Sequence, residues 1–212
     1  MQDGLEVIAR MPYPKTVPKK YAIASEVATM DFVRLHGVPV PRVYDYSITT
    51  QNCVGAEYMI MEKVGGKLLW DWDVLTPQGR DKIIEQIVKM EATLFSIHFP
   101  ASGSIYYKKD LDAHVKTAEI LSPNGSPDFC IGPSAAASWW YQERAEMALD
   151  RGPYADCRET SKAIGKRELA WANQYAQPRY PADGILREML DYKKIPPDDH
   201  IQTLEKYLQL SD

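Results

Sequence analysis

The sequence lacks the features that mark membrane, nucleic-acid-binding and disulfide-rich proteins. No apolar run approaches the roughly 18 residues that a membrane-spanning helix needs, so we expect no membrane partner. The formal net charge is −4, which argues against a nucleic-acid partner. There are only three cysteines, Cys53, Cys130 and Cys157, and their wide spacing matches neither a disulfide framework nor a zinc site.

The cysteines and the start of the chain both favour an intracellular protein. An odd number of widely spaced thiols is typical of a reducing compartment. A secretory signal has a basic segment followed by an apolar one. The first ten residues, MQDGLEVIAR, have no such layout. We therefore expect a cytoplasmic location. The 212 residues are enough for one sizeable core or for two smaller ones that share a cleft.

The first 64 residues predict a small sheet with one helix. Apolar patterning indicates three strands, over residues 5–11, 42–48 and 56–63. Turn-forming residues between the second and third strands favour an antiparallel hairpin. Helical spacing predicts a helix over residues 22–35, and Gly37 is suited to the left-handed conformation that ends it. The pair Gly65-Gly66 then marks a change of direction.

Beyond Gly66 the sequence becomes mainly helical. Helical periodicity predicts four helices, over residues 81–98, 134–150, 157–176 and 198–210. We expect a short strand or loop over residues 102–107 and a loop over residues 122–133. The chain is therefore predicted to be α+β. Residues 1–64 would form a reduced N-lobe of about three antiparallel strands and one helix, and residues 65–212 a mainly helical C-lobe.

Seven short segments, taken in order, match the pattern of one known family. They are residues 7–12 (VIARMP), 25–30 (SEVATM), 37–41 (GVPVP), 55–62 (GAEYMIME), 103–107 (GSIYY), 131–133 (IGP) and 150–153 (DRGP). Arg167-Glu168 and Trp171 continue the match. Together these segments resemble the aminoglycoside phosphotransferase family, in particular its fungal phosphotransferase branch with a protein-kinase-like fold. The resemblance covers about residues 5–207.

The resemblance implies ATP-dependent phosphorylation of a small-molecule hydroxyl, with ATP and Mg²⁺ as cofactors. Arg10 falls where such kinases carry a strand lysine that contacts nucleotide phosphates, and Glu26 falls where its ion-pair partner lies. Arginine differs from lysine because its planar fork prefers bidentate contacts, so a purely structural bridge is the alternative reading. Glu62 and Val64 fall where backbone groups would bond an adenine edge. These four residues are the predicted cofactor-binding set.

Two parts of that family's catalytic machinery have no match. Nine residues precede Arg10, too few for the glycine-rich hairpin that covers the phosphates. None of the four histidines is followed two places later by aspartate, so a His-x-Asp catalytic loop is missing. Asp128-Phe129-Cys130 lacks the glycine of a metal-binding Asp-Phe-Gly triplet. We therefore predict no catalytic and no metal-binding residues in this chain, and expect it to be truncated at both ends.

Three functions are compatible with these observations. The first is a kinase-fold protein, a pseudokinase, that binds a small molecule or a partner without transferring phosphate. The second is a fragment of an ordinary ATP-dependent phosphotransferase. The third is a cleft adapted to a non-phosphoryl reaction such as cyclisation or isomerisation.

The absent segments would also leave apolar surface uncovered, so we expect a homo-oligomer or a bound partner chain. The tryptophans are a further candidate feature. Trp70, Trp72, Trp139, Trp140 and Trp171 could line a ligand pocket. Packing within the helical part is the interpretation that we favour.

Overall fold

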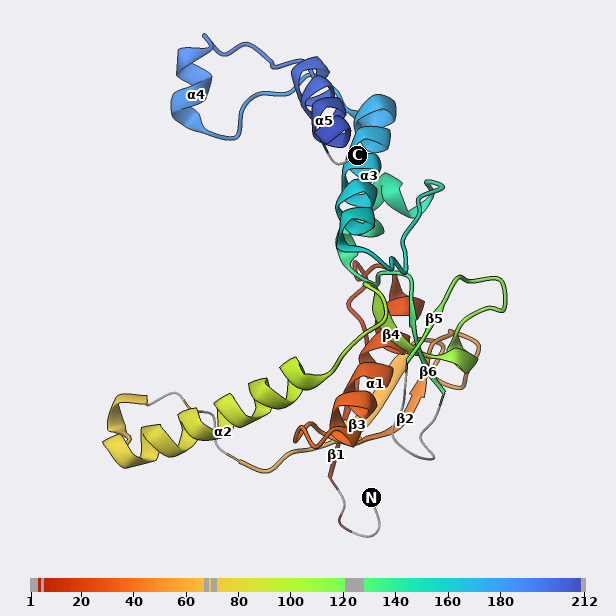
Figure 1. Ribbon diagram of the computed structural model, residues 1–212, viewed down its shortest axis with the longest axis vertical. Helices are drawn as coiled ribbons and strands as arrows, with labels where there is room; N and C mark the ends of the chain where they lie inside the picture. The colour runs from red at the N-terminus through yellow and green to blue at the C-terminus, as the bar shows by residue number, and fades with distance from the viewer. Residues whose placement is uncertain (1–3, 5, 67–68, 70–71, 121–127, 211–212) are drawn as a thin grey trace.

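The computed structural model begins with an antiparallel sheet of three strands (Figure 1). It describes residues 4, 6–66, 69, 72–120 and 128–210. Strands β1 (Val7–Arg10), β2 (Val43–Ser47) and β3 (Tyr58–Glu62) lie in the order β1-β3-β2. The predicted hairpin is confirmed, because β2 and β3 pair antiparallel.

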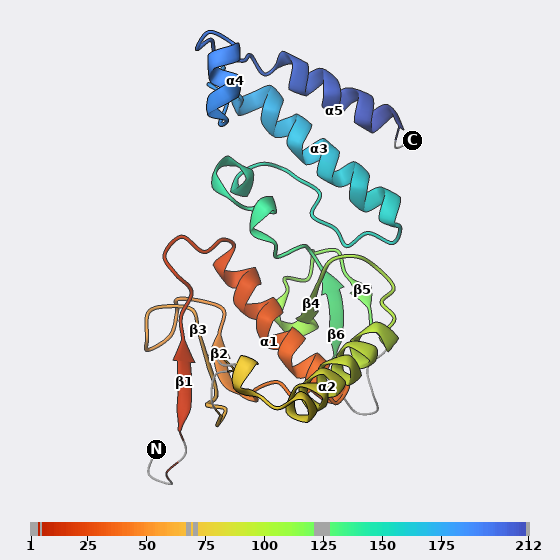
Figure 2. The same ribbon diagram turned by 90° about the vertical axis from the view of Figure 1, so that its left-hand side faces the viewer.

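Helix α1 (Lys19–Leu35) is the central element, since it packs against strands of two different sheets (Figure 2). Its buried side is apolar and includes Ile23, Val27 and Phe32. The helix ends at His36, whose Nδ1 lies 2.8 Å from the carbonyl oxygen of Phe32. Gly37 follows with φ +84°, in the left-handed conformation predicted for it.

A second antiparallel sheet lies on the other side of α1. It consists of β4 (Ser104–Tyr107), β5 (Ala118–Glu119) and β6 (Phe129–Gly132), in the order β4-β6-β5. The predicted loop over residues 122–133 is therefore wrong at its end, where all four residues of β6 are buried. Residues 122–127 of that prediction lie outside the described residues. A four-residue apolar run becomes a strand here because β4 and β5 pair with both of its edges.

One hydrophobic core joins the two sheets through α1. Its buried residues are Ile23, Val27, Ala28, Phe32, Met59, Tyr107, Ile120, Phe129 and Ile131. Some of these side chains precede the Gly65-Gly66 break in the sequence and others follow it, so α1 packs against residues from both parts of the chain. The division into lobes at residues 64 and 65 stays a prediction.

The remaining elements are mostly helical. A 3-10 turn (Trp72–Val74) precedes α2 (Pro77–Ser96), and the hydroxyl of Thr76 caps that helix by accepting from the Gly79 N–H at 3.1 Å. A second such turn, Lys108–Asp110, follows β4. Towards the end of the described chain lie α3 (Cys157–Tyr175), α4 (Gly184–Met189) and α5 (Asp198–Leu210). The helices predicted over residues 81–98, 157–176 and 198–210 are confirmed.

The predicted helix over residues 134–150 is wrong. This segment forms two short 3-10 turns, Ala137–Trp139 and Gln142–Ala145. The guanidinium of Arg151 explains the difference, because it donates to the carbonyl oxygens of four residues in this segment: Trp139, Arg144, Met147 and Leu149. An α-helix over residues 134–150 would need two of these carbonyls, those of Trp139 and Arg144, for its own hydrogen bonds.

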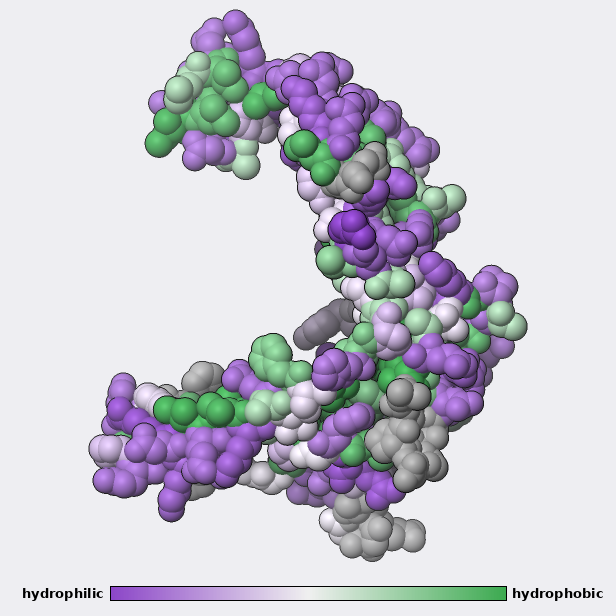
Figure 3. All heavy atoms as spheres, viewed as in Figure 1, coloured by the Kyte–Doolittle hydropathy of each residue, from purple (hydrophilic) through white to green (hydrophobic). Residues whose placement is uncertain are grey.

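The helices give the molecule an open, curved outline (Figure 3). Helix α2 projects away from the sheets, while α3, α4 and α5 extend from the opposite end of the second sheet (Figure 1). Within the described part of the chain, no helix is long and apolar enough to span a membrane. The α+β fold class is confirmed.

Candidate functional site

The structure brings together two of the four residues predicted to hold a nucleotide. Arg10 is the last residue of β1, and its Nη1 pairs with Oε1 of Glu26 on α1. The Arg10 side chain is 55% exposed and that of Glu26 is 33% exposed. Because a guanidinium carries five N–H donors, Arg10 keeps donors available on its solvent side. The arrangement can therefore hold an anion against the end of β1.

Packing beneath the pair sets its position. Arg10 lies opposite Met59 in the β1–β3 register, and Met59 is buried against α1. Glu26 lies between Ser25 and Val27, which are both buried on the inner side of the helix. An exposed ion pair contributes only about 0–1 kcal/mol of stability. The core below the pair, rather than the pair itself, therefore holds β1 and α1 together.

Glu62 forms hydrogen bonds within the sheet through both its side chain and its backbone N–H. Its carboxylate accepts from the Arg42 N–H at 3.0 Å, and its own N–H donates to the Arg42 carbonyl at 2.8 Å. Glu62 lies opposite Val7 in the register, three residues along β1 from Arg10. Alternation along a strand then directs the Glu62 side chain to the sheet face opposite that of Arg10.

Val64 lies just beyond the end of β3 and is 61% exposed. At about 3.3 Å per residue, the end of β3 is roughly 10 Å along the sheet from Arg10. Glu62 and Val64 are thus separate from the Arg10–Glu26 pair. Their predicted contact with the adenine would use backbone groups only, and their assignment stays a prediction.

Two part-buried tyrosine–carboxylate contacts fix the second sheet to the first sheet and to α1. The hydroxyl of Tyr46 donates to Asp110 Oδ2 at 2.8 Å, and that of Tyr107 donates to Asp31. Burial, followed by these carboxylates, raises the pKa of both tyrosines, so both stay protonated donors. The Lys109 Nζ lies over both rings, 5.2 and 5.3 Å from their centroids.

Sequence reasoning missed these contacts. The partners are 64 and 76 residues apart in the chain, and no local motif links them. Through Asp31 on α1, the cluster helps to hold the helix that carries Glu26. The cluster therefore helps to position the candidate site, although its residues are not part of that site.

The titratable groups that the sequence singled out elsewhere have structural roles. Phe129 and Cys130 are buried on β6, so the Asp128-Phe129-Cys130 triplet begins a strand and does not form a metal-binding loop. The ring nitrogens of His36 and His98 contact nearby backbone carbonyls. Within the described residues, no group of three or more His, Cys, Asp or Glu side chains could hold a metal ion.

Comparison with known proteins identifies the family. The family model described as "Phosphotransferase enzyme family" matches residues 3–182. A subtelomeric hrmA-associated cluster protein of Aspergillus fumigatus is 46% identical over 154 residues, which cover 72% of this chain and 29% of that protein. "Altered inheritance of mitochondria protein 9, mitochondrial" of Saccharomyces cerevisiae is 35% identical over 151 residues, covering 63% of this chain and 24% of that protein. No solved structure matches the chain.

These relatives are fungal proteins, as the resemblance implied, and they are much longer. The matched part of this chain corresponds to between 24% and 34% of the relatives' own length. The expected cytoplasmic location is contradicted, because the yeast relatives are named as mitochondrial proteins. The absence of a basic-then-apolar signal in the first ten residues was not a sufficient basis for that expectation, since mitochondrial targeting segments have a different composition.

Proposed function

The chain belongs to the phosphotransferase enzyme family, and we propose that it binds the phosphates of ATP at Arg10 but does not transfer phosphate by itself. The Arg10–Glu26 ion pair between β1 and α1 carries this proposal. An exposed cation held in place by a helix carboxylate is the arrangement that kinase-like folds use to orient nucleotide phosphates.

Each residue of the predicted set has a distinct part in this proposal. Arg10 contacts phosphate oxygens through the guanidinium donors that Glu26 does not occupy. Glu26 fixes the direction of the Arg10 side chain. The backbone at Glu62, roughly 10 Å away along the sheet, and at Val64, just beyond the end of β3, contacts the base. The strand register therefore separates a phosphate end from a base end.

Binding without transfer follows from the groups that are missing. Phosphoryl transfer needs a base that orients the acceptor hydroxyl and carboxylates that hold Mg²⁺. The 212 residues contain no His-x-Asp sequence, and the described residues include no group of three or more His, Cys, Asp or Glu side chains that could hold a metal ion. The length of the relatives supports a second candidate. The matched part of this chain corresponds to 29% of the Aspergillus fumigatus relative, and in this second candidate the chain is the nucleotide-binding part of a larger phosphotransferase.

The names of the yeast relatives support a mitochondrial location for this protein. Expression in yeast of the natural protein, carrying a C-terminal fluorescent tag, would test this. Overlap of the tag with a mitochondrial dye is the expected result. A diffuse cytosolic signal would contradict it.

Helix α2 supports the proposal that the chain associates with a second copy of itself. None of its residues is buried, and its exposed apolar residues include Ile84, Ile87, Val88, Leu94 and Phe95. Their side of α2 faces the concave side of the molecule (Figure 3). A helix that is apolar along one side can pair with an identical helix across a two-fold axis, because the same residues then cover each other.

Calorimetric titration with ATP, with and without Mg²⁺, tests the nucleotide proposal. Arg10→Ala should weaken ATP binding by about tenfold or more, since one charge-assisted hydrogen bond contributes roughly 1.5–3 kcal/mol. Arg10→Lys should restore part of the affinity, because the charge remains while the fork is lost. Arg158→Ala is the matched control, because Arg158 is exposed and pairs with its neighbour Asp156.

Two results would contradict the proposal. One is the absence of both binding heat and a thermal shift at millimolar ATP. The other is an equal loss of affinity in the Arg10 and Arg158 variants, which would indicate a non-specific charge effect. Formation of ADP above background, with the purified chain and a panel of small-molecule alcohols, would contradict the lack of transfer and favour the second candidate.

A further inference from the structure

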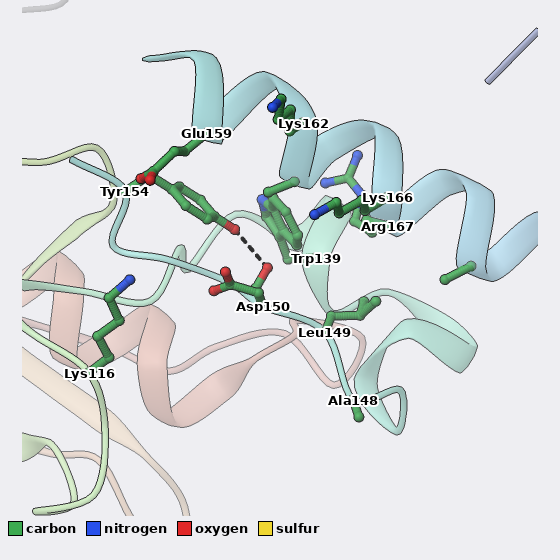
Figure 4. Close-up of a pocket in the computed structure, with 12 residues that line it drawn as sticks. Lys116, Trp139, Ala148, Leu149, Asp150, Tyr154, Glu159, Lys162, Lys166 and Arg167 are labelled. Carbon is green, nitrogen blue, oxygen red and sulfur yellow. Dashed lines mark hydrogen bonds between the residues drawn. The ribbon is translucent and has the colours of Figure 1, made fainter. Parts of the chain in front are cut away.

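We propose that a cavity between α3 and the Asp150–Tyr154 loop binds a small phosphorylated molecule that also has a flat apolar part (Figure 4). The cavity has a volume of about 530 Å³, within the size range of small-molecule sites. It is bordered by the segment Asp150-Arg151-Gly152-Pro153, which the nucleotide proposal leaves without a function. Its lining residues do not include the predicted nucleotide-binding residues.

The floor of the cavity is aromatic and held in place. Trp139 and Tyr154 are both buried, with ring centroids 6.4 Å apart. The Tyr154 hydroxyl donates to the Asp150 carbonyl at 2.6 Å, which ties the ring to the loop. Ala163 of α3 packs against the same two rings. This surface fits a flat apolar part of a ligand.

The guanidinium of Arg167 forms a further part of the wall. It lies 4.4 Å from the centroid of the Trp139 ring. Its charge is already paired, because Nη2 and Nε lie 2.7 and 2.8 Å from Oε1 of Glu168. Nη1 also donates to the Ser138 hydroxyl at 3.2 Å. Arg167 therefore holds Trp139 in place, and we do not assign it the ligand's charge.

Lysines supply the charge at the rim. Lys162 and Lys166 lie on α3, and Lys116 reaches towards the cavity from the opposite side, on the loop before β5 (Figure 4). Two carboxylates, Asp150 and Glu159, also line the cavity. Cationic side chains therefore outnumber acidic ones here, although the chain as a whole has a net charge of −4.

Two of these lysines have no partner that competes with a ligand. Within the described part of the chain, neither Lys116 nor Lys166 forms an ion pair or a side-chain hydrogen bond. A lysine is a compact point charge with three donors, which suits a phosphate oxygen. A dianion between two lysines on opposite sides of the cavity would be attracted more strongly than a monoanion, because the Coulomb energy grows with the charge. We therefore infer a phosphate rather than a single carboxylate.

Phenylphosphonate is a suitable probe, because it joins an aromatic ring to a stable dianionic group. We expect calorimetric titration of the full chain at low ionic strength and mildly alkaline pH to show binding. Benzoate, with one negative charge, should bind more weakly, and neutral benzyl alcohol more weakly still. Added salt should lower the affinity for phenylphosphonate, since the lysines are exposed to solvent.

Removing the two unpaired lysines tests the position of the site. The double variant Lys116→Ala, Lys166→Ala should bind phenylphosphonate at least about tenfold more weakly, the loss expected from one or two charge-assisted contacts. The control Lys82→Ala, Lys206→Ala removes the same charge from exposed positions on α2 and α5, and should bind as the natural sequence does. Both pairs lie on the surface, so the variants should fold.

Each contrary outcome is distinct. No measurable binding of phenylphosphonate, equal binding of benzyl alcohol, or an equal loss in the two double variants would each overturn the proposal. Arg10→Ala separates this site from the nucleotide site. Phenylphosphonate binding should be unchanged in that variant, whereas its loss would place the probe at Arg10 and overturn the second site. Failure of ATP to bind would leave this inference standing.

Discussion

Replacing Glu168 with glutamine should destabilise the half of the molecule that contains α3. Its carboxylate accepts from Arg144 Nη2 at 2.7 Å and from two nitrogens of Arg167. The side chains of Arg144 and Arg167 are only 14% and 9% exposed. Each guanidinium also lies over a tryptophan ring, that of Trp171 or Trp139. Glu168→Gln keeps the size of the side chain but leaves two nearly buried cations without a counter-charge.

The size of the effect follows from this burial. Breaking a buried ion pair typically costs about 3–5 kcal/mol. Glu168 itself is 29% exposed, so water can reach the site and reduce the cost to about 2–4 kcal/mol. For a chain of this length, 1 kcal/mol corresponds to a shift of about 2–4 °C in the melting temperature. We expect Tm to fall by roughly 4–16 °C.

The pH dependence gives an independent check. Burial taken alone would raise the pKa of Glu168, but the hydrogen bonds and charges of Arg144 and Arg167 outweigh it and lower the pKa. A lowered folded-state pKa contributes stability above the unfolded-state value, about 4.3 for glutamate. That contribution is lost as the pH falls through the folded-state pKa. The difference between the natural sequence and Glu168→Gln should therefore narrow below about pH 4.

Thermal and urea unfolding followed by circular dichroism would measure these differences. The control is Glu159→Gln, also on α3, where the exposed carboxylate has no ion pair among the described residues; the expected change is under about 0.5 kcal/mol. A Glu168→Gln variant as stable as the natural sequence would refute the reasoning. So would a stability difference that stays constant down to pH 2, the acid limit of such measurements.

Two further predictions concern packing and assembly. Gly103→Ala would place a Cβ 2.4 Å from the Gly132 carbonyl oxygen and 2.6 Å from Ile131 Cγ2. The free energy of unfolding in urea should therefore fall by about 1–3 kcal/mol. As a control, the Cβ of Gly184→Ala meets no atom within 4 Å, so this variant should keep the free energy of unfolding of the natural sequence. Equal stabilities of the two variants would contradict the prediction, because they would show that the sheet adjusts to the added Cβ. Light scattering should find a dimer at micromolar concentration, which Ile87→Glu converts to a monomer while Lys82→Glu, a charge change elsewhere on α2, does not. A monomeric natural sequence would contradict association through α2.

The family match and the Arg10–Glu26 pair show what could be predicted from sequence patterns. The ordered segments from VIARMP to DRGP indicated the family before any fold was known, and the family match over residues 3–182 confirms it. Arg10 and Glu26 were paired by that resemblance, and the structure places them in contact. A residue's role in nucleotide binding does not follow from contact alone, so the four site assignments stay predictions.

Local patterns determined the elements whose signal lies within their own residues. The helix predicted over residues 198–210 has the same bounds in the structure, and the strands of the first sheet lie within their predicted ranges. In each case the apolar spacing repeats over several residues, so one segment carries enough information to define the element.

Long-range contacts decided the rest. Strand β6 exists because two other segments of the chain, β4 and β5, supply its hydrogen-bonding partners. Residues 134–150 are not an α-helix because one side chain, Arg151, takes the carbonyls that a helix would need. The cavity lined by Trp139, Tyr154 and the three lysines likewise joins separate segments. Such contacts have no periodic signature in the chain, since their energy appears only once folding has brought the partners together.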